Sequence, residues 1–354
     1  MSTSSNKSVV KELQSRDIDI LRGLYEYRAL STEQIMRYFR ISKWYTYKKL
    51  TALRNSGYII TTPIKGYNPH QSRQGNYHRI SETGIACLRK QGYPAERRAY
   101  DLRVRIRHLP FLLMTNDILM ALSQFNWTVE DSRAAKKRHN LNRGVNIQGI
   151  LKNACDQDYV LYSFLENTSV KNLEKIASEI TMHKFTDYLF ICRGGGSFQA
   201  IINRFIDSDA MLKCQSLKVF PRGLGKDYLR AFEGSAQQFN AYLQQVHNST
   251  LSFRTSFKRR KNFKGLDQVV HHNGEEKYLV NLLDTDLVKI YNMKRYRKED
   301  YEMDGRKVLV ITEPHLKSIH HKLLESVHHI DYMEITQDEI KAALHKDWKG
   351  RSKS

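Results

Sequence analysis

The sequence has little of what marks secreted, zinc-bound or membrane-spanning proteins. Its four cysteines lie far apart and none falls in a CxxC pair, so neither a disulfide framework nor a zinc site is predicted. No apolar run approaches the roughly 18 residues of a membrane span, and the first residues contain no apolar leader segment. These absences favour a reduced, cytoplasmic protein that has no membrane partner.

Acidic residues are also scarce relative to basic ones. The 354 residues include 58 Lys and Arg but 37 Asp and Glu, a net charge of +21. Residues 1–110 alone hold 21 Lys and Arg against 8 Asp and Glu. A chain this basic needs a polyanionic partner, and nucleic acid is the first candidate, ahead of an anionic membrane surface. The length predicts two or three domains.

Three short helices are predicted near the N-terminus. Apolar residues recur at helical spacing in residues 17–30, and Ser31 with Gln34 forms a capping-box pattern that opens a second helix. After a tight turn, a third helix follows over residues 43–56 and stops at Gly57, a residue suited to the position after a helix. Two helices joined by such a turn form a helix-turn-helix.

Two strands and another helix follow the helix-turn-helix. Residues 58–62 are β-branched and aromatic, a polar loop covers residues 64–76, and a second strand spans residues 77–80. Ser81 then opens a fourth helix. This order predicts a winged-helix DNA-binding domain over residues 1–93.

In a winged helix the third helix enters the major groove, and the wing loop follows the backbone or a neighbouring groove. With Tyr47, Leu50 and Leu53 predicted to face inward, the outward lysines suit phosphate contacts. The predicted DNA-binding residues are Ser42, Lys43, Trp44, Tyr45, Thr46, Lys48, Lys49 and Arg54 on the helix and Lys65, Arg73 and Arg79 in the wing. The candidates for base contacts among them are Ser42, Tyr45 and Thr46. The alternative is that Trp44 and Tyr45 pack on the first helix and the lysines form a solvated face.

Residues 94–125 are predicted to form a basic and apolar helical connector. A basic stretch, PAERRAYDLRVRIR, leads into the apolar run HLPFLLMTNDILMALSQF, and a long helix is predicted over residues 101–124 with a bend at Pro110. The apolar stripe suits either the joining of the DNA-binding head to a second domain or the packing of a partner subunit. A homodimer therefore stays open.

The remaining residues, 126–345, alternate between strand and helix patterns. Strand, helix and strand are predicted over residues 158–193 and again over residues 277–312. The predicted fold class is therefore α/β overall, with an N-terminal winged helix-turn-helix, a helical connector and a C-terminal α/β domain that has a mixed sheet. A degenerate restriction-nuclease-like form of that domain is left open.

A basic and aromatic segment, residues 252–265, lies within this domain. Phenylalanines are interleaved there with cations, a combination that suits a single strand or a phosphate backbone. The candidate residues of this secondary nucleic-acid patch are Arg254, Lys258, Arg259, Arg260, Lys261 and Lys264. The alternative is a solvated loop whose phenylalanines anchor it to the core.

The patterns that catalysis requires are incomplete. A relaxase of the common type needs two histidines separated by one residue, whereas the histidine pairs here are adjacent. A Walker A loop fails because Asp227 stands where Ser or Thr belongs. A restriction-type nuclease would use Asp158 and Glu166 with a lysine two residues beyond, where Thr168 stands. The sequence predicts no catalysis, no metal and no cofactor.

Residues 17–125 resemble the replication-relaxation family of bacterial plasmids, integrative elements and phages. The resemblance is carried by DIDILRGLYEYRALSTEQI, KKLTALRNSGYI, ISETGIACL and RHLPFLLMTNDILMAL, the last with its His-Leu and Asn-Asp pairs. It implies a winged-helix protein that binds double-stranded DNA. The implied role is that of an accessory in plasmid or phage replication, DNA relaxation or mobilisation, with other replication or relaxosome proteins as partners.

Two other functions fit the same pattern. A transcriptional repressor would have the same DNA-binding head and an α/β domain that senses a ligand or a partner. A divergent metal-dependent nuclease is the third hypothesis. Footprinting separates the first two, since a site over a promoter favours repression and a site at an origin favours replication or mobilisation.

Overall fold

The chain divides into two compact units, residues 1–120 and 121–354. The structure is a computed structural model, and it describes residues 12–64, 75–254 and 266–344. Helices and mixed β-sheets occur together, which confirms the predicted α/β class. No helix in the part of the chain that the structure describes is both long enough and apolar enough to cross a bilayer.

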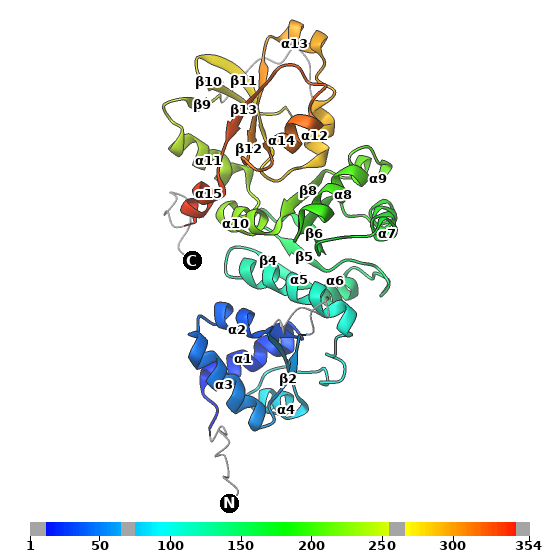
Figure 1. The fold of residues 1–354 in the computed structure, drawn as a ribbon, viewed down its shortest axis with the longest axis vertical. Helices are drawn as coiled ribbons and strands as arrows, with labels where there is room; N and C mark the ends of the chain where they lie inside the picture. The colour runs from blue at the N-terminus through cyan, green and yellow to red at the C-terminus, as the bar shows by residue number, and fades with distance from the viewer. Residues whose placement is uncertain (1–11, 65–74, 255–265, 345–354) are drawn as a thin grey trace, which may run out of the picture. The chain divides into compact units, whose positions relative to one another are not determined.

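The first unit packs short helices around a small antiparallel sheet (Figure 1). Its elements in chain order are α1 (Ser15–Glu26), β1 (Leu30–Ser31), α2 (Thr32–Tyr38), α3 (Lys43–Asn55), β2 (Ile59–Pro63), β3 (Asn76–Ile80) and α4 (Glu82–Lys90). The strands lie in the order β1-β3-β2, and both pairings are antiparallel. The sequence predicted each of these elements except β1, because a two-residue strand shows no readable alternation.

Local sequence signals explain where these helices begin and end. Ser31 and Gln34 form the predicted capping box: the Gln34 N–H donates to the Ser31 hydroxyl at 3.1 Å, and the Ser31 N–H donates to the Gln34 side chain at 3.0 Å. Gly57 follows α3 with a φ of 75°, in the left-handed region that glycine adopts readily. The Tyr58 N–H then donates to the Leu53 carbonyl at 3.0 Å, which closes the end of the helix.

The packed face of α3 differs from the prediction by one residue. Leu50 and Leu53 are buried as predicted, but Thr46 completes that face, and Tyr47, predicted to face inward, is 49% exposed. Positions 46, 50 and 53 follow the i, i+4, i+7 spacing of one helical face. The threonine is tolerated inside because its hydroxyl donates to the Ser42 carbonyl at 2.9 Å.

The long helix predicted for the connector is shorter than expected. The chain leaves α4 through an irregular stretch and a 3-10 turn (Ile106–His108), and only then forms α5 (Leu109–Leu122). The prediction of a helix over residues 101–124 with a bend at Pro110 is therefore wrong. Proline lies in the first turn of α5, where its missing N–H costs no hydrogen bond.

Much of the predicted connector packs as part of the first unit. Leu102 and Met120 are buried in the same apolar core as α1 and α3. The Asn116 side chain of α5 donates to the Tyr27 and Ala29 carbonyls at 2.9 and 2.8 Å. These contacts hold α5 against the chain segment that joins α1 to β1.

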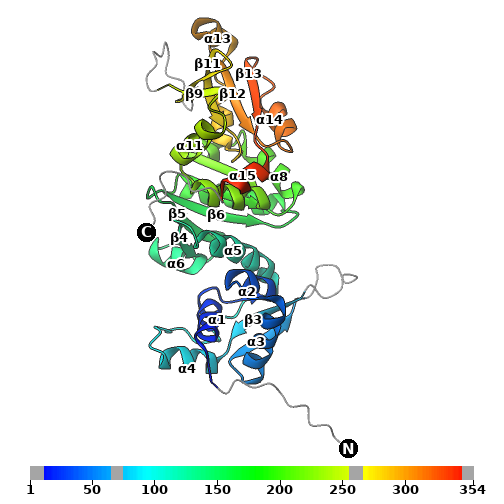
Figure 2. The same cartoon turned by 90° about the vertical axis from the view of Figure 1, so that its left-hand side faces the viewer.

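The second unit contains two five-stranded mixed sheets built on one plan (Figure 2). The first sheet runs β4 (Thr128–Asp131), β5 (Gly149–Lys152), β6 (Asp158–Phe164), β7 (Asp187–Cys192) and β8 (Ser216–Pro221). The second runs β9 (Leu251–Phe253), β10 (Val269–His272), β11 (Glu275–Asn281), β12 (Lys307–Thr312) and β13 (Ile330–Glu334). In each sheet the first three strands pair antiparallel and the last two are added in parallel. The mixed sheet predicted for this part of the chain is confirmed.

Helices connect and cover these strands. They are α6 (Ser132–Arg138), α7 (Val170–Met182), α8 (Gly195–Phe205), α9 (Asp209–Leu212), α10 (Arg222–Phe232), α11 (Ala236–Val246), α12 (Leu287–Met293), α13 (Lys298–Asp304), α14 (Lys317–Leu323) and α15 (Gln337–Ala343). Parallel neighbours require crossover connections, which α7 supplies between β6 and β7. From the C-terminal end, α15 returns to pack on α10 (Figures 1 and 2), where the Gln337 side chain donates to Asp227 at 2.7 Å.

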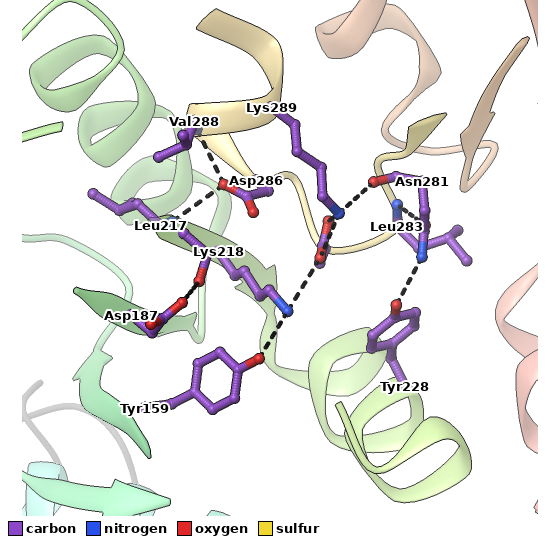
Figure 3. Close-up of polar contacts among 12 residues, drawn as sticks. Tyr159, Asp187, Leu217, Lys218, Tyr228, Asn281, Leu283, Asp286, Val288 and Lys289 are labelled. Carbon is purple, nitrogen blue, oxygen red and sulfur yellow. Dashed lines mark hydrogen bonds and ion pairs between the residues drawn. The ribbon is translucent and has the colours of Figure 1, made fainter. Parts of the chain in front are cut away.

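A buried polar cluster links the two sheets (Figure 3). Asp284, in the turn after β11, lies 3.6 Å from the Lys218 ammonium of β8 and 3.2 Å from the Lys289 ammonium of α12. Asp286, two residues on, accepts from the Leu217 N–H of β8 at 3.1 Å. These contacts fix the beginning of α12 against β8.

The charges of this cluster offset one another. Burial raises the pKa of Asp284, but the ammonium groups of Lys289 and Lys218 outweigh burial and hold that pKa below its ordinary value. Burial lowers the pKa of Lys218, but the Asp284 carboxylate outweighs it and raises the pKa. Asp284, Lys218 and Lys289 thus have charged partners within the cluster, which accounts for it as a structural link between the sheets.

Candidate nucleic-acid interface

Helix α3 presents one packed face and one open face. Thr46, Leu50 and Leu53 point into the core of the first unit. The opposite face, which we call the α3 face, consists of exposed residues at helical spacing: Lys43, Trp44, Tyr47, Lys48, Thr51 and Arg54, with Ser42 just before the helix. Five of the eight residues predicted to bind DNA through this helix are in that set, and the other three, Tyr45, Thr46 and Lys49, are not.

Thr46 does not belong to the α3 face. Its side chain is fully buried, and its hydroxyl is engaged by the Ser42 carbonyl one turn earlier. The predicted base contact for Thr46 is therefore replaced by a packing role. Ser42 keeps its predicted place, because its side chain is exposed and makes no capping hydrogen bond to α3.

Lys49 is also removed from the predicted phosphate contacts. Its ammonium lies 2.9 Å from the Asp17 carboxylate of α1 and 2.7 Å from the Gln14 side-chain oxygen. The Lys49 side chain is 13% exposed and that of Asp17 is fully buried. This lysine therefore neutralises a buried carboxylate and holds α3 against α1. Its neighbour Lys48 points to solvent as predicted.

The two aromatic residues at the beginning of α3 differ in role. Tyr45 is half-buried against the core of the unit, and its hydroxyl lies 3.5 Å from the Gln14 side chain, so the alternative of packing on the first helix applies to it. Trp44 is 71% exposed, and the Lys48 ammonium lies 5.1 Å from its ring centre. Trp44 therefore stays on the α3 face, and Tyr47 joins it there.

Cations dominate what remains on the α3 face. Lys43, Lys48 and Arg54 are exposed and form no ion pair with any residue that the structure describes. The helix itself contains no acidic residue. Three uncompensated cations beside two exposed rings make a surface suited to an anion that also offers apolar or aromatic groups.

The strands beside α3 hold part of the predicted wing. Arg79 lies half-buried on β3, opposite the exposed Ile60 of β2. Lys65 and Arg73 lie outside the described residues, so their predicted contacts stay predictions.

A buried histidine braces the same strands. His78 of β3 is 3% exposed, and its ring nitrogens lie 2.9 Å from the Thr32 hydroxyl and 3.0 Å from the Thr61 hydroxyl. Burial lowers the pKa of His78 to about 4, and the Arg54 charge adds to this effect. The neutral ring therefore joins α2 to the β2–β3 hairpin. The positive charge of Arg54 lies close enough to the sheet to act on this ring.

Only one residue of the predicted secondary patch lies in the described part of the chain. Arg254 follows β9, and its guanidinium lies 3.0 Å from the Glu276 carboxylate of β11. Its charge is therefore already partnered. The other members of the patch, Lys258, Arg259, Arg260, Lys261 and Lys264, lie outside the described residues.

The carboxylates considered for a nuclease do not come together. Asp158 is the first residue of β6 and Glu166 lies two residues beyond its last residue, so the strand alone separates its two ends by about 20 Å at ~3.3 Å per residue. Asp158 lies 3.8 Å from Lys152, and Glu166 lies 3.8 Å from Arg193. Among the described residues, no three His, Cys, Asp or Glu side chains are grouped as a metal site requires.

The glycine turn after β7 has a packing role. A Cβ atom added to Gly194 would lie 2.9 Å from the Glu166 backbone, so the close approach of two loops requires glycine there.

Comparisons with known proteins add no relative. No family model, no curated protein and no solved structure matches the chain.

Proposed function

We propose that the first unit is a winged-helix domain that binds double-stranded DNA through the α3 face. The order of its elements supports this assignment: two helices separated by a tight turn, α2 and α3, precede the antiparallel hairpin of β2 and β3. A winged helix uses the second helix of such a pair for the major groove and the hairpin loop for the flanking backbone.

The observation that carries the proposal is the charge of the α3 face. Lys43, Lys48 and Arg54 are spread over its full length, and the helix holds no carboxylate to offset them. Phosphates of a duplex provide the missing countercharge, and release of their bound cations favours binding at low salt. The net charge of +21 acts in the same direction by drawing the chain toward any polyanion.

The aromatic and small polar residues give this face a means of choosing sequence. Trp44 and Tyr47 present apolar ring surface, which suits contact with thymine methyl groups in the major groove. Ser42 and Thr51 are exposed hydroxyl groups on the same side and are able to donate to, or accept from, base edges. The lysines, by contrast, contact phosphates and carry no sequence information.

The biological role proposed is that of a cytoplasmic DNA-binding accessory protein of a mobile genetic element, in replication, relaxation or mobilisation. It rests on the resemblance of residues 17–125 alone. Binding without catalysis is proposed because Asp158 and Glu166 lie beyond reach of a shared metal. A homodimer fits the proposal, since one small domain reads only a short half-site.

The double substitution Lys43→Ala and Lys48→Ala tests the α3 face. It should remove two phosphate contacts and lower the slope of log affinity against log salt by about 1.8, while the preference among sequences stays nearly unchanged. Both lysines are exposed helix positions, where alanine preserves folding. Fluorescence anisotropy with a labelled duplex at several salt concentrations gives the slope.

The matched control is the pair Lys171→Ala and Lys184→Ala, which removes the same charge from exposed positions of the second unit. Its salt slope should equal that of the wild type. An α3 variant that melts normally and keeps the wild-type slope would show that α3 does not lie against DNA.

A further inference from the structure

The stretch between α4 and α5 is unusually rich in arginine. Residues 97–108, which we call the arginine segment, contain five arginines and one acidic residue, Asp101. Asp101 is turned toward the backbone, since it accepts from the Arg98 N–H at 3.2 Å. This segment is not part of the α3 face. From residue 101 onward it was predicted to belong to the connector helix.

Alternate residues anchor the arginine segment to the first unit. Leu102 is 1% exposed and lies in the main core. Val104 packs against a second apolar cluster that contains Ala29, Tyr77 of β3 and Leu109 of α5. The arginine side chains between and after these two anchors are exposed.

Arg103, Arg105 and Arg107 are all exposed, and none forms an ion pair with a residue that the structure describes. The Arg103 guanidinium lies 5.0 Å from the Tyr100 ring, which is itself 70% exposed. Arg28 joins them from the end of α1, because its guanidinium donates to the Arg103 carbonyl at 3.1 Å.

The pKa of the histidine at the end of the segment reflects the positive charge around it. Burial lowers the pKa of His108, and the positive charges of Arg107, Arg105 and Arg28 lower it further. The arginines therefore stand close enough to one another to repel an added proton. An anion bound among them would relieve that repulsion.

We propose that the arginine segment is a second phosphate-binding surface, which contacts the backbone of the same duplex that the α3 face binds. This inference rests on the proposed function of the α3 face. Arginine suits the role because its planar guanidinium donates two parallel hydrogen bonds to one phosphate. Val104 and Ile64, the residue that follows β2, also pack against the same apolar cluster, so the segment shares that cluster with the end of the first hairpin strand.

The test is the triple substitution Arg103→Gln, Arg105→Gln and Arg107→Gln in the full chain. Glutamine keeps an unbranched polar side chain but removes the charge of each arginine, and the anchors Leu102 and Val104 are untouched. Removal of three phosphate contacts should lower the salt slope by about 2.7 and weaken binding at 0.1 M salt by roughly 500-fold. Preference among duplex sequences should not change, because backbone contacts do not read bases.

A matched control removes the same charge elsewhere. Lys171→Gln, Lys184→Gln and Lys213→Gln lie on the exposed surface of the second unit, and their salt slope should stay near that of the wild type. If the triple arginine variant fails to fold, Arg105→Gln alone should lower the slope by about 0.9. As a second measurement, NMR titration should show the His108 pKa rising when the wild-type protein binds duplex.

The outcomes separate the inference from the proposed function. A wild-type slope in the arginine variants, together with a reduced slope for Lys43→Ala and Lys48→Ala, would overturn the inference and leave the α3 face in place. If the arginine variants lose binding to phosphatidylserine vesicles but not to duplex, the segment contacts a lipid surface, and the inference is overturned as well. Failure of the wild-type protein to bind any duplex at low salt would overturn both.

Discussion

Replacement of Lys49 by alanine should lower the free energy of unfolding of the first unit by about 3–5 kcal/mol. The Asp17 carboxylate is fully buried, and the Lys49 ammonium at 2.9 Å is its charged partner. Without that partner, the carboxylate would stay buried, and the Gln14 N–H, 3.0 Å away, would be its remaining hydrogen-bond donor among the residues that the structure describes. Urea unfolding of the variant, followed by circular dichroism, measures the loss.

The neighbouring lysine is the natural control. Lys48→Ala removes the same charge from the same helix, but its ammonium contacts solvent and the Trp44 ring, so stability should change by well under 1 kcal/mol. The double variant Asp17→Asn and Lys49→Met should recover most of the loss, because it leaves no unpaired buried charge. Equal stability of the two single variants would show that the Asp17–Lys49 pair does not hold the helices together.

Acidification from pH 6.5 to 4 should cost each unit about 3 kcal/mol through one buried histidine. Burial lowers the pKa of His78 in the first unit and of His320 in the second to about 4. Each ring lies between two threonine hydroxyls, at 2.7 and 3.0 Å from Thr312 and Thr285 in the case of His320. Because the unfolded chain takes up the proton near pH 6.5 and the folded chain near pH 4, stability falls as pH falls through that interval.

The contribution of each histidine is obtained by difference. Urea unfolding at half-unit steps from pH 7 to 4 should show a steeper loss for the wild type than for His78→Gln in the first unit or His320→Gln in the second. Glutamine retains a donor and an acceptor for the threonines but does not titrate. Parallel pH profiles for wild type and variants would show that these histidines are not held neutral by the fold.

Local signals allowed the helix boundaries of the first unit to be predicted from sequence. The Ser31–Gln34 capping box and the left-handed Gly57 depend on residues at most a few positions apart, so the sequence displays the whole interaction. The same holds for the strongly apolar β6 and β7, whose residues are buried on both faces.

Contacts with residues distant in the sequence explain the wrong predictions on α3. Lys49 was predicted to face solvent because its partner, Asp17, lies 32 residues earlier on another helix. Tyr47 was predicted to face inward and Thr46 outward, whereas the structure has the reverse, because either position fits the packed helical face. A threonine whose hydroxyl donates to a backbone carbonyl is readily buried. The signal that was available, a carboxylate at position 17 on the apolar side of α1, indicated that some cation had to cover it.

The arginine segment was misjudged for a related reason. Its composition favours helix, but Leu102 and Val104 are anchored in two different apolar clusters, and the chain forms no helix there. The short edge strands β4 and β9 were missed because only their neighbours in the sheet define them. In each case the decisive contact joins residues that are distant in the sequence.

Lysine labelling tests the central claim most directly. The full chain is treated with an amine-reactive reagent, with and without saturating duplex DNA at low salt, and each lysine is quantified by mass spectrometry. Lys43 and Lys48 should be strongly protected by DNA, whereas Lys171, Lys184 and Lys213 of the second unit should label at unchanged rates. Unchanged labelling of Lys43 and Lys48 with protection confined to the second unit would contradict the assignment of DNA binding to the α3 face.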